Sequence, residues 1–159
     1  ITEEYSNLEY LSQSGAISEA FSDIAGEAAE YFLYGKADWI AGATITKGEQ
    51  PIRYISQPER DGRSISHIKQ YKPELSVHQL SGLYSRAFHL LIEERGWTMA
   101  SAFRVFVNAN KMYWNSRTNF SEGVCGLKLA AQDIGLNDRD IELVFLNVGV
   151  ECQGGRGFS

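Results

Sequence analysis

The stretch SGAISEAFSDIAGEAAE, residues 14–30, decides the fold of this chain. Its apolar residues recur every three or four positions: Ala16, Ile17, Ala20, Phe21, Ile24, Ala25 and Ala28. This spacing is typical of an amphipathic helix whose apolar side is buried. Such a helix needs other elements to cover it, so we expect the core to form around residues 14–30.

The opposite side of this predicted helix carries four carboxylates. They are Glu19, Asp23, Glu27 and Glu30, spaced four, four and three residues apart. Like charges at i,i+4 repel by roughly 0.2–0.5 kcal/mol per pair, and no Lys or Arg occurs in residues 1–35 to offset them. The helix itself leaves two interpretations open, because such a face is either solvated or a set of metal ligands and their neighbours.

Length and composition predict one globular domain with a sizeable core, because 43% of the 159 residues are hydrophobic. The net charge of −5 argues against nucleic acid or an anionic membrane surface as a partner. No apolar run approaches the ~20 residues that span a bilayer. The N-terminal residues, Ile1-Thr2-Glu3-Glu4, are unlike a signal peptide and indicate the interior of a longer protein.

The rest of the chain is predicted to be mainly helical. Further helices are expected from Val77, over Met99–Trp114, from Asn119 or Ser121 to Gly135, and from Asn137 onward. Between the first helix and these, glycines and three prolines interrupt regular structure, which predicts a loop-rich insert around residues 41–74. The expected fold is a helical bundle over residues 1–152, followed by a flexible, glycine-rich tail, residues 153–159.

Several segments carry a family resemblance. Asn7-Leu8-Glu9-Tyr10, Gln13-Ser14-Gly15 and the run from Glu19 to Phe32 resemble the segment that follows HExxH in thermolysin-like metallopeptidases, in particular the vibriolysin and pseudolysin group. The resemblance extends over residues 1–152. It implies the α-helical C-terminal domain of a secreted zinc metalloendopeptidase that hydrolyses peptide bonds.

The HExxH motif itself is absent from this chain. Its only histidines are His67, His78 and His89, and no two have the HxxxH spacing. Two zinc ligands and the catalytic glutamate would therefore lie upstream, in an N-terminal peptidase domain that is the expected partner. The chain alone is expected to be inactive, because one carboxylate does not hold zinc in a catalytic geometry.

The resemblance implies roles for four residues in the catalytic site. Glu19 matches the third zinc ligand, and Asp23 matches a carboxylate that orients a ligating histidine. Tyr10 and His78 match the pair that stabilises the oxyanion. An alternative of another class is a non-catalytic helical domain, binding or inhibitory, that retains the peptidase scaffold.

Substrate contacts are implied for the insert. In Pro51-Ile52-Arg53-Tyr54, Arg53 matches the residue that donates to a peptide carbonyl on the leaving side of the scissile bond. Ile52, with Ile45, is expected to line the neighbouring apolar pocket. The chain departs from the family near His78, where the usual aspartate two residues earlier is replaced by Ser76. Either Glu74 supplies the missing carboxylate, or His78 is less readily protonated.

A calcium site and a disulfide are also implied. Glu27, Glu30 and Asp38, with a backbone oxygen of Ile40, match the family's structural calcium site, and calcium prefers such hard oxygen ligands. Composition leaves Cys125 and Cys152 open as two thiols or one bridge. The pseudolysin branch has a bridge at this spacing, and a bridge would indicate an oxidising, extracellular compartment.

Overall fold

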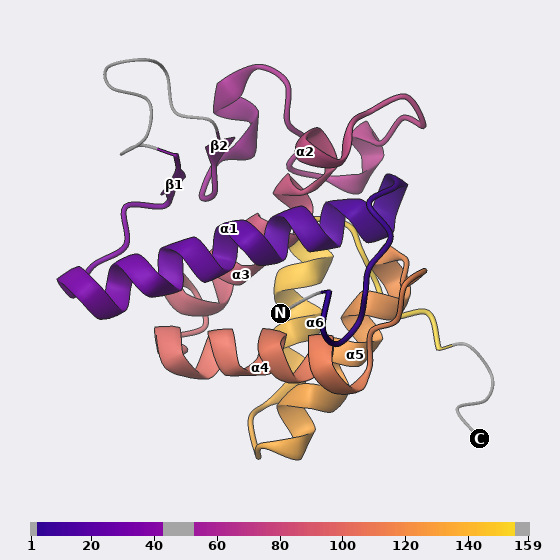
Figure 1. Ribbon diagram of the computed structural model, residues 1–159. Helices are drawn as coiled ribbons and strands as arrows, with labels where there is room; N and C mark the ends of the chain where they lie inside the picture. The colour runs from indigo at the N-terminus through magenta and orange to yellow at the C-terminus, as the bar shows by residue number, and fades with distance from the viewer. Residues whose placement is uncertain (1–2, 43–52, 155–159) are drawn as a thin grey trace.

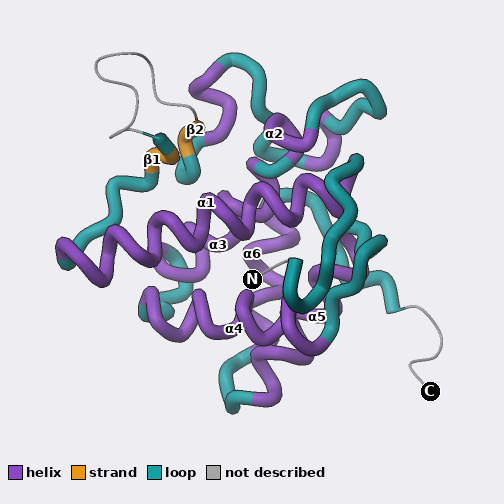
Figure 2. The backbone as a smooth tube through the Cα atoms, viewed as in Figure 1, coloured by secondary structure: helices purple, strands orange, loops and turns teal. Residues whose placement is uncertain are grey.

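The computed structural model of the protein describes residues 3–42 and 53–154. Its elements in chain order are α1 (Ser12–Tyr34), β1 (Ile40–Ala41), β2 (Arg53–Tyr54), the 3-10 turns η1 (Pro58–Asp61) and η2 (Ile68–Gln70), α2 (Val77–Leu80), α3 (Gly82–Glu93), α4 (Met99–Met112), α5 (Phe120–Asp133) and α6 (Asp138–Asn147). Helices dominate the fold (Figures 1 and 2), as the sequence predicts. None of the described helices is both long and apolar enough to cross a bilayer.

Helix α1 is longer than predicted and lies across the helical body (Figure 1). It ends at Gly35, whose φ of 74° allows its N–H to donate to the Tyr31 carbonyl. Its apolar side, including Ile17 and Ile24, is fully buried and packs against α2, α3, α4 and α5. The predicted amphipathic pattern therefore organises the core, and the acidic side of α1 faces the loop-rich insert.

Aromatic residues fill the core beneath α1. Tyr84 is almost fully buried, and its hydroxyl donates to the Phe120 carbonyl at 2.6 Å. Gly123 permits this approach, because a Cβ at that position would lie 2.2 Å from the Tyr84 hydroxyl oxygen. The Tyr84 ring also meets Phe145 edge-on, at 4.8 Å between centroids. These contacts join α3, α5 and α6 into one body.

The helix expected from Val77 is interrupted. Its first turn forms α2, and after Ser81 the chain continues as α3. Ser76 caps α2 by accepting from the Gln79 N–H, and Ser81 donates its hydroxyl to the His78 carbonyl at 2.8 Å. Gly82 follows because a Cβ there would meet the Ile65 carbonyl oxygen at 2.4 Å. The break holds His78 on a short turn of its own.

The remaining boundaries are close to those predicted. Helix α4 ends at Met112, two residues before the predicted Trp114, and Asn119 rather than Ser121 caps α5. Asn137 caps α6 as expected. In the insert, Ile40 pairs with Tyr54 and Ala41 with Arg53 in a short antiparallel ladder that the sequence did not predict. This ladder brings Arg53 to the acidic side of α1.

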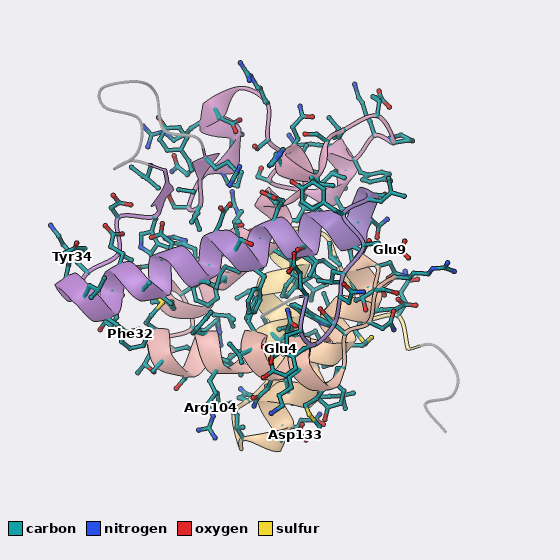
Figure 3. The ribbon with its side chains drawn as sticks, in the orientation of Figure 1. Glu4, Glu9, Phe32, Tyr34, Arg104 and Asp133 are labelled. Atoms are coloured by element: carbon teal, nitrogen blue, oxygen red, sulfur yellow. A yellow bond between two sulfur atoms is a disulfide. The ribbon has the colours of Figure 1, made fainter. Side chains whose placement is uncertain are left out.

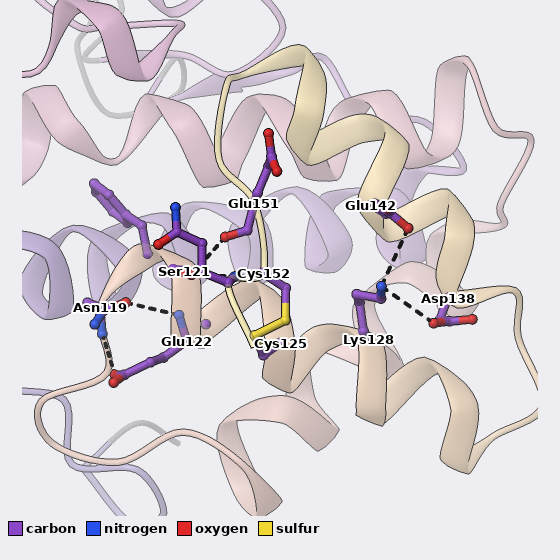
Figure 4. The surroundings of a disulfide bond; sticks show 12 residues. Asn119, Ser121, Glu122, Cys125, Lys128, Asp138, Glu142, Glu151 and Cys152 are labelled. Atoms are coloured by element: carbon purple, nitrogen blue, oxygen red, sulfur yellow. Dashed lines mark hydrogen bonds and ion pairs between the residues drawn. A yellow bond between two sulfur atoms is a disulfide. The ribbon is translucent and has the colours of Figure 1, made fainter. Parts of the chain in front are cut away.

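A disulfide joins Cys125 in α5 to Cys152 after α6, with Cα atoms 4.9 Å apart (Figure 4). Ser121 donates its hydroxyl to the Glu151 carbonyl at 2.7 Å and accepts from the Gln153 N–H at 2.9 Å. The chain is thus held against α5 as far as Gln153. Of the tail predicted to be flexible, residues 155–159 lie outside the described residues.

Candidate active site and cation site

The carboxylate of Glu19 lies at the centre of a cluster of polar side chains. Tyr10, just before α1, donates its hydroxyl to Glu19 Oε1 at 2.6 Å. His78 Nδ1, from α2, lies 2.9 Å from Glu19 Oε2. The Tyr10 hydroxyl is also 3.3 Å from His78 Nε2. One carboxylate therefore brings a phenol and an imidazole into mutual contact.

Tyr10 is held in its protonated form. Desolvation, followed by the hydrogen bond to Glu19 and the charge of that carboxylate, raises the pKa of Tyr10 to about 12. The phenol consequently keeps its proton at neutral pH and remains a hydrogen-bond donor. More than half of the Tyr10 side chain is exposed, so this donor is accessible from solvent.

Asp23, one turn after Glu19 on α1, holds Arg53 from β2. Arg53 donates Nε–H to Asp23 Oδ2 at 2.6 Å and Nη2–H to Asp23 Oδ1 at 2.7 Å. The side chains are 19% and 7% exposed, so this two-pronged ion pair is largely shielded from water. Burial raises the pKa of Asp23, with Arg53 opposing it, and the hydrogen bonds to Asp23 raise the pKa of Arg53.

The paired guanidinium lies next to the Glu19 cluster. Arg53 Nη2 is 3.6 Å from Glu19 Oε2, and Arg53 Nη1 is 3.3 Å from His78 Nδ1. Three segments that are distant in sequence thus meet on the acidic side of α1. The insert supplies Arg53, α2 supplies His78, and the segment before α1 supplies Tyr10. The site is a set of hydrogen-bond donors grouped around one carboxylate.

Ser76 and Glu74 are not bonded to His78. The Ser76 hydroxyl accepts from the Gln79 N–H and caps α2, and Glu74 is exposed. Among the described residues, the carboxylate bonded to the imidazole is Glu19. The sequence did not predict this contact or the Asp23–Arg53 pair, because the residues lie 59 and 30 positions apart. Ile45 and Ile52, expected to line the substrate pocket, lie outside the described residues.

A second acidic cluster lies farther along α1. Ligand atoms of Glu27, Glu30 and Asp38 all lie within 4.8 Å of one another. The loop after α1 is folded onto these carboxylates. The Trp39 N–H donates to Glu27 at 2.9 Å, the Asp38 N–H to Glu30 at 3.1 Å, and the Ile40 N–H to Asp38 at 2.8 Å. Trp39 takes a left-handed φ of 61° to make this turn.

Burial gives Glu27 an unusual titration. Burial raises the pKa of Glu27 to about 7. The hydrogen bond from the Trp39 N–H opposes this shift, and the charges of Asp38 and Glu30 add to it. An open cavity of about 450 Å³ lies over the three carboxylates. Hard oxygen ligands around such a space suit a divalent cation such as calcium, whose charge would favour the ionised carboxylates.

Comparison with known families agrees with this architecture. The family model described as "Thermolysin metallopeptidase, alpha-helical domain" matches residues 6–150. The chain belongs to this family. As its α-helical domain, the chain contains the whole of the Glu19 cluster and the second acidic cluster.

Relatives named as proteases match almost the full chain. It is 49% identical over 154 residues to the hemagglutinin/proteinase of Vibrio cholerae, a match that covers 97% of this chain and 25% of that protein. It is 47% identical over 154 residues to the neutral protease of Vibrio proteolyticus, again covering 97% and 25%. A zinc metalloprotease of Helicobacter pylori is 49% identical over 150 residues, covering 94% of this chain and 58% of that protein.

A solved structure shares the fold. The precursor of protealysin, a metalloproteinase from Serratia proteamaculans, superposes with a TM-score of 0.82 at 21% identity, covering 94% of this chain and 53% of that one. The chain spans about a quarter of the length of the Vibrio relatives.

Proposed function

We propose that this chain forms the C-terminal part of a secreted zinc metalloendopeptidase. The observation that carries the proposal is the convergence of Tyr10, His78 and Arg53 on the Glu19 carboxylate. Hydrogen-bond donors grouped at one place suit a reaction in which negative charge develops on a substrate oxygen. Membership of the thermolysin metallopeptidase family supports the same reaction class.

Glu19 is the residue that would hold zinc. A carboxylate is one of the zinc ligands of proteins, and catalytic sites use three protein ligands with a fourth position open. Within the described ranges, no group of three ligand atoms includes Glu19, so this chain fits as the donor of one ligand. The other two would come from the N-terminal peptidase domain. Zinc, when bound, supplies polarisation of the scissile carbonyl and activation of water.

Tyr10 and His78 would stabilise the oxyanion. Their polar atoms are 3.3 Å apart, close enough for both groups to donate to one oxygen placed between them and Glu19. The raised pKa keeps the Tyr10 proton available. Such donors act mainly in the transition state, where the charge develops, and therefore affect kcat more than KM.

Arg53 would position the peptide. Its link to Asp23 uses Nε and Nη2 and leaves Nη1 beside the imidazole, so the guanidinium is oriented before substrate arrives. A preoriented donor on the peptide backbone reduces the ordering that binding requires. Asp23 acts here through Arg53, as a positioning residue.

An exposed apolar surface supports a larger partner. The last turn of α1 carries Tyr31, Phe32, Leu33 and Tyr34, which are 40–75% exposed; Phe32 and Tyr34 project from its end (Figure 3). Such a concentration of exposed apolar side chains is typical of an interface. We infer that the N-terminal peptidase domain packs against it.

The same proposal includes calcium at Glu27, Glu30 and Asp38, with Ile40 next to them, and secretion. The disulfide between Cys125 and Cys152 supports an oxidising, extracellular location.

A peptide-cleavage assay tests the function. The assay uses the protein that joins this chain to its upstream segment. We expect hydrolysis by the wild-type protein and loss of nearly all activity with Glu19→Gln, which keeps the shape but weakens the ligand. Glu4→Gln, at an exposed position, is the control and should leave the rate unchanged. No cleavage by the wild-type protein, with the fold intact by circular dichroism, would favour the non-catalytic binding or inhibitory domain.

A further inference from the structure

A second cavity adjoins the Glu19 cluster, on the side of His78 and Arg53. Its volume is about 450 Å³, and Arg53, Arg63, His78 and Asp61 line it together with small polar residues. Tyr10, Glu19 and Asp23 are not part of its lining. The cavity thus shares the substrate-facing groups of the site without its acidic centre.

The loop after η1 fixes the place of Arg63. Asp61 Oδ1 accepts from the Arg63 N–H and the Ser64 N–H, each at 2.7 Å, and Asp61 Oδ2 accepts from the Ser64 hydroxyl at 2.6 Å. Gly62 takes a φ of 73°, which lets the chain fold back on Asp61. From α2, Gln79 donates to the Arg63 carbonyl at 3.4 Å. The backbone of Arg63 is therefore anchored at the cavity wall.

The lining of the cavity includes one guanidinium, that of Arg63, with no acceptor among the described residues. Burial alone would raise the pKa of Asp61, but hydrogen bonds from Ser64 and Arg63 and the charge of Arg63 lower it overall. The ionised Asp61 directs both oxygens to its own loop. Within residues 3–42 and 53–154, the Arg63 guanidinium has no hydrogen bond or ion pair, and Arg53 Nη1 meets only His78 Nδ1. Guanidinium N–H groups of this kind match the two oxygens of a carboxylate.

We propose that this cavity is a substrate subsite for a carboxylate, which Arg63 holds beside Arg53. The inference rests on the proposed peptidase function and names its substrate class. The preferred peptides carry an acidic side chain, or a free C-terminal carboxylate, on the leaving side of the scissile bond. Arg63 is then a residue that determines specificity, while the chemistry stays with the Glu19 cluster.

Matched peptides test the subsite in the protein that joins this chain to its upstream segment. One pair differs by Glu or Gln within two residues after the scissile bond, and a second pair by a free or amidated C-terminus. We expect kcat/KM about three- to tenfold higher for one or both carboxylate forms. Arg63→Gln should bring that ratio close to one, chiefly by lowering kcat/KM for the carboxylate form. Arg60→Gln is the control, because the Arg60 guanidinium lies 4.5 Å over the Tyr54 ring, and should keep the ratio.

The outcomes separate the subsite from the proposed function. The subsite alone is overturned if the wild-type protein cleaves the carboxylate and neutral peptides with nearly equal kcat/KM. It is also overturned if the ratio of these two values is unchanged in Arg63→Gln. The pair that shows the preference identifies the source of the carboxylate. If no peptide is cleaved, the peptidase proposal fails, and titration of the 159-residue chain with N-acetylglutamate by NMR decides the subsite. Ligand-induced shifts of the backbone amide signals of residues 63 and 64 support the subsite if Arg63→Gln abolishes them, and the absence of such shifts overturns it.

Discussion

At the scale of single residues, the site depends on how one carboxylate is shared. Glu19 accepts from Tyr10 and contacts His78 while Arg53 lies close to it. Each of these groups is held by a different segment, so none reaches Glu19 through local structure alone. The consequence is a preorganised set of donors whose individual contributions are measurable in the protein that joins this chain to its upstream segment.

Tyr10→Phe removes one donor and keeps the ring. We expect kcat to fall by about 10²–10³-fold with a much smaller change in KM, because the lost hydrogen bond acts on the transition state. Steady-state kinetics on one peptide measure both constants. Tyr5→Phe is the control, because the Tyr5 ring contacts Lys111 away from this site. A rise in KM at constant kcat would show that Tyr10 binds the ground state instead.

Asp23→Ala leaves the largely shielded Arg53 without its partner. Removing one member of a shielded ion pair leaves the charge of the other member uncompensated and poorly solvated. We therefore expect the free energy of unfolding to fall by about 3 kcal/mol. Urea unfolding of this chain measures it. Asp23→Ala combined with Arg53→Met should cost less than the sum of the single changes. Strict additivity would mean that the two residues do not stabilise each other.

The contacts of His78 mark the limit of prediction at this scale. Family resemblance pointed to His78, Tyr10, Arg53 and Glu19 from local segments. For the partner of the imidazole, however, it left only Ser76 or Glu74 to consider. The structure uses Ser76 as a helix cap and places Glu19 against the ring. Helix-cap chemistry is readable from the sequence in the S-x-x-Q pattern. A contact across 59 residues is set by tertiary packing.

At the scale of elements, α1 has two acidic sites and one apolar side. The apolar period predicted the buried side because every third or fourth residue must face the core. The paired strands β1 and β2 were not predictable, since two residues carry no periodic signal. Their position depends on the loop that folds over Glu27 and Asp38.

The raised pKa of Glu27 predicts a pH dependence in the presence of a chelator. The folded chain retains the Glu27 proton to about pH 7, whereas the unfolded chain loses it near 4.5. The folded state therefore binds more protons between these values, and the free energy of unfolding should fall by up to about 3 kcal/mol as the pH rises from 4.5 to 7. Urea unfolding in EGTA measures this slope, and Glu27→Gln should flatten it.

Calcium should reverse that effect. Binding to the folded state alone must stabilise it, and a bound cation favours ionised Glu27. We expect millimolar calcium to raise the thermal midpoint most at pH 7, and Asp38→Asn to reduce the gain. An equal midpoint with and without calcium at pH 7 would argue against the site.

At the scale of the whole molecule, one aromatic core and one disulfide connect the helices. The sequence predicted the helical class and most helix boundaries through apolar periods and caps such as Asn119 and Asn137. It did not predict the break at Ser81, next to which tertiary packing brings the Ile65 carbonyl close to Gly82. Composition left the cysteines open, and the bridge followed only from resemblance.

Loss of the disulfide should destabilise the chain without changing its fold. Cys125 and Cys152 are 27 positions apart, and closing a loop of this size restricts the unfolded state by about 3–4 kcal/mol in the chain-entropy model. The double variant Cys125→Ser and Cys152→Ser should lose about this amount in urea unfolding, with unchanged circular dichroism. The reduced wild-type chain should behave alike, and equal stability of the oxidised and reduced chains would contradict the prediction.

Zinc content tests the central claim most directly, because Glu19 is proposed as the ligand that this chain gives to the metal. The protein that joins the chain to its upstream segment is purified, dialysed against a zinc-free buffer and analysed for metal by mass spectrometry. We predict about one zinc per wild-type molecule and per Glu4→Gln control. Glu19→Ala should retain almost none while keeping its helical content. A full complement of zinc in Glu19→Ala would contradict the assignment of Glu19 and, with it, the proposed site.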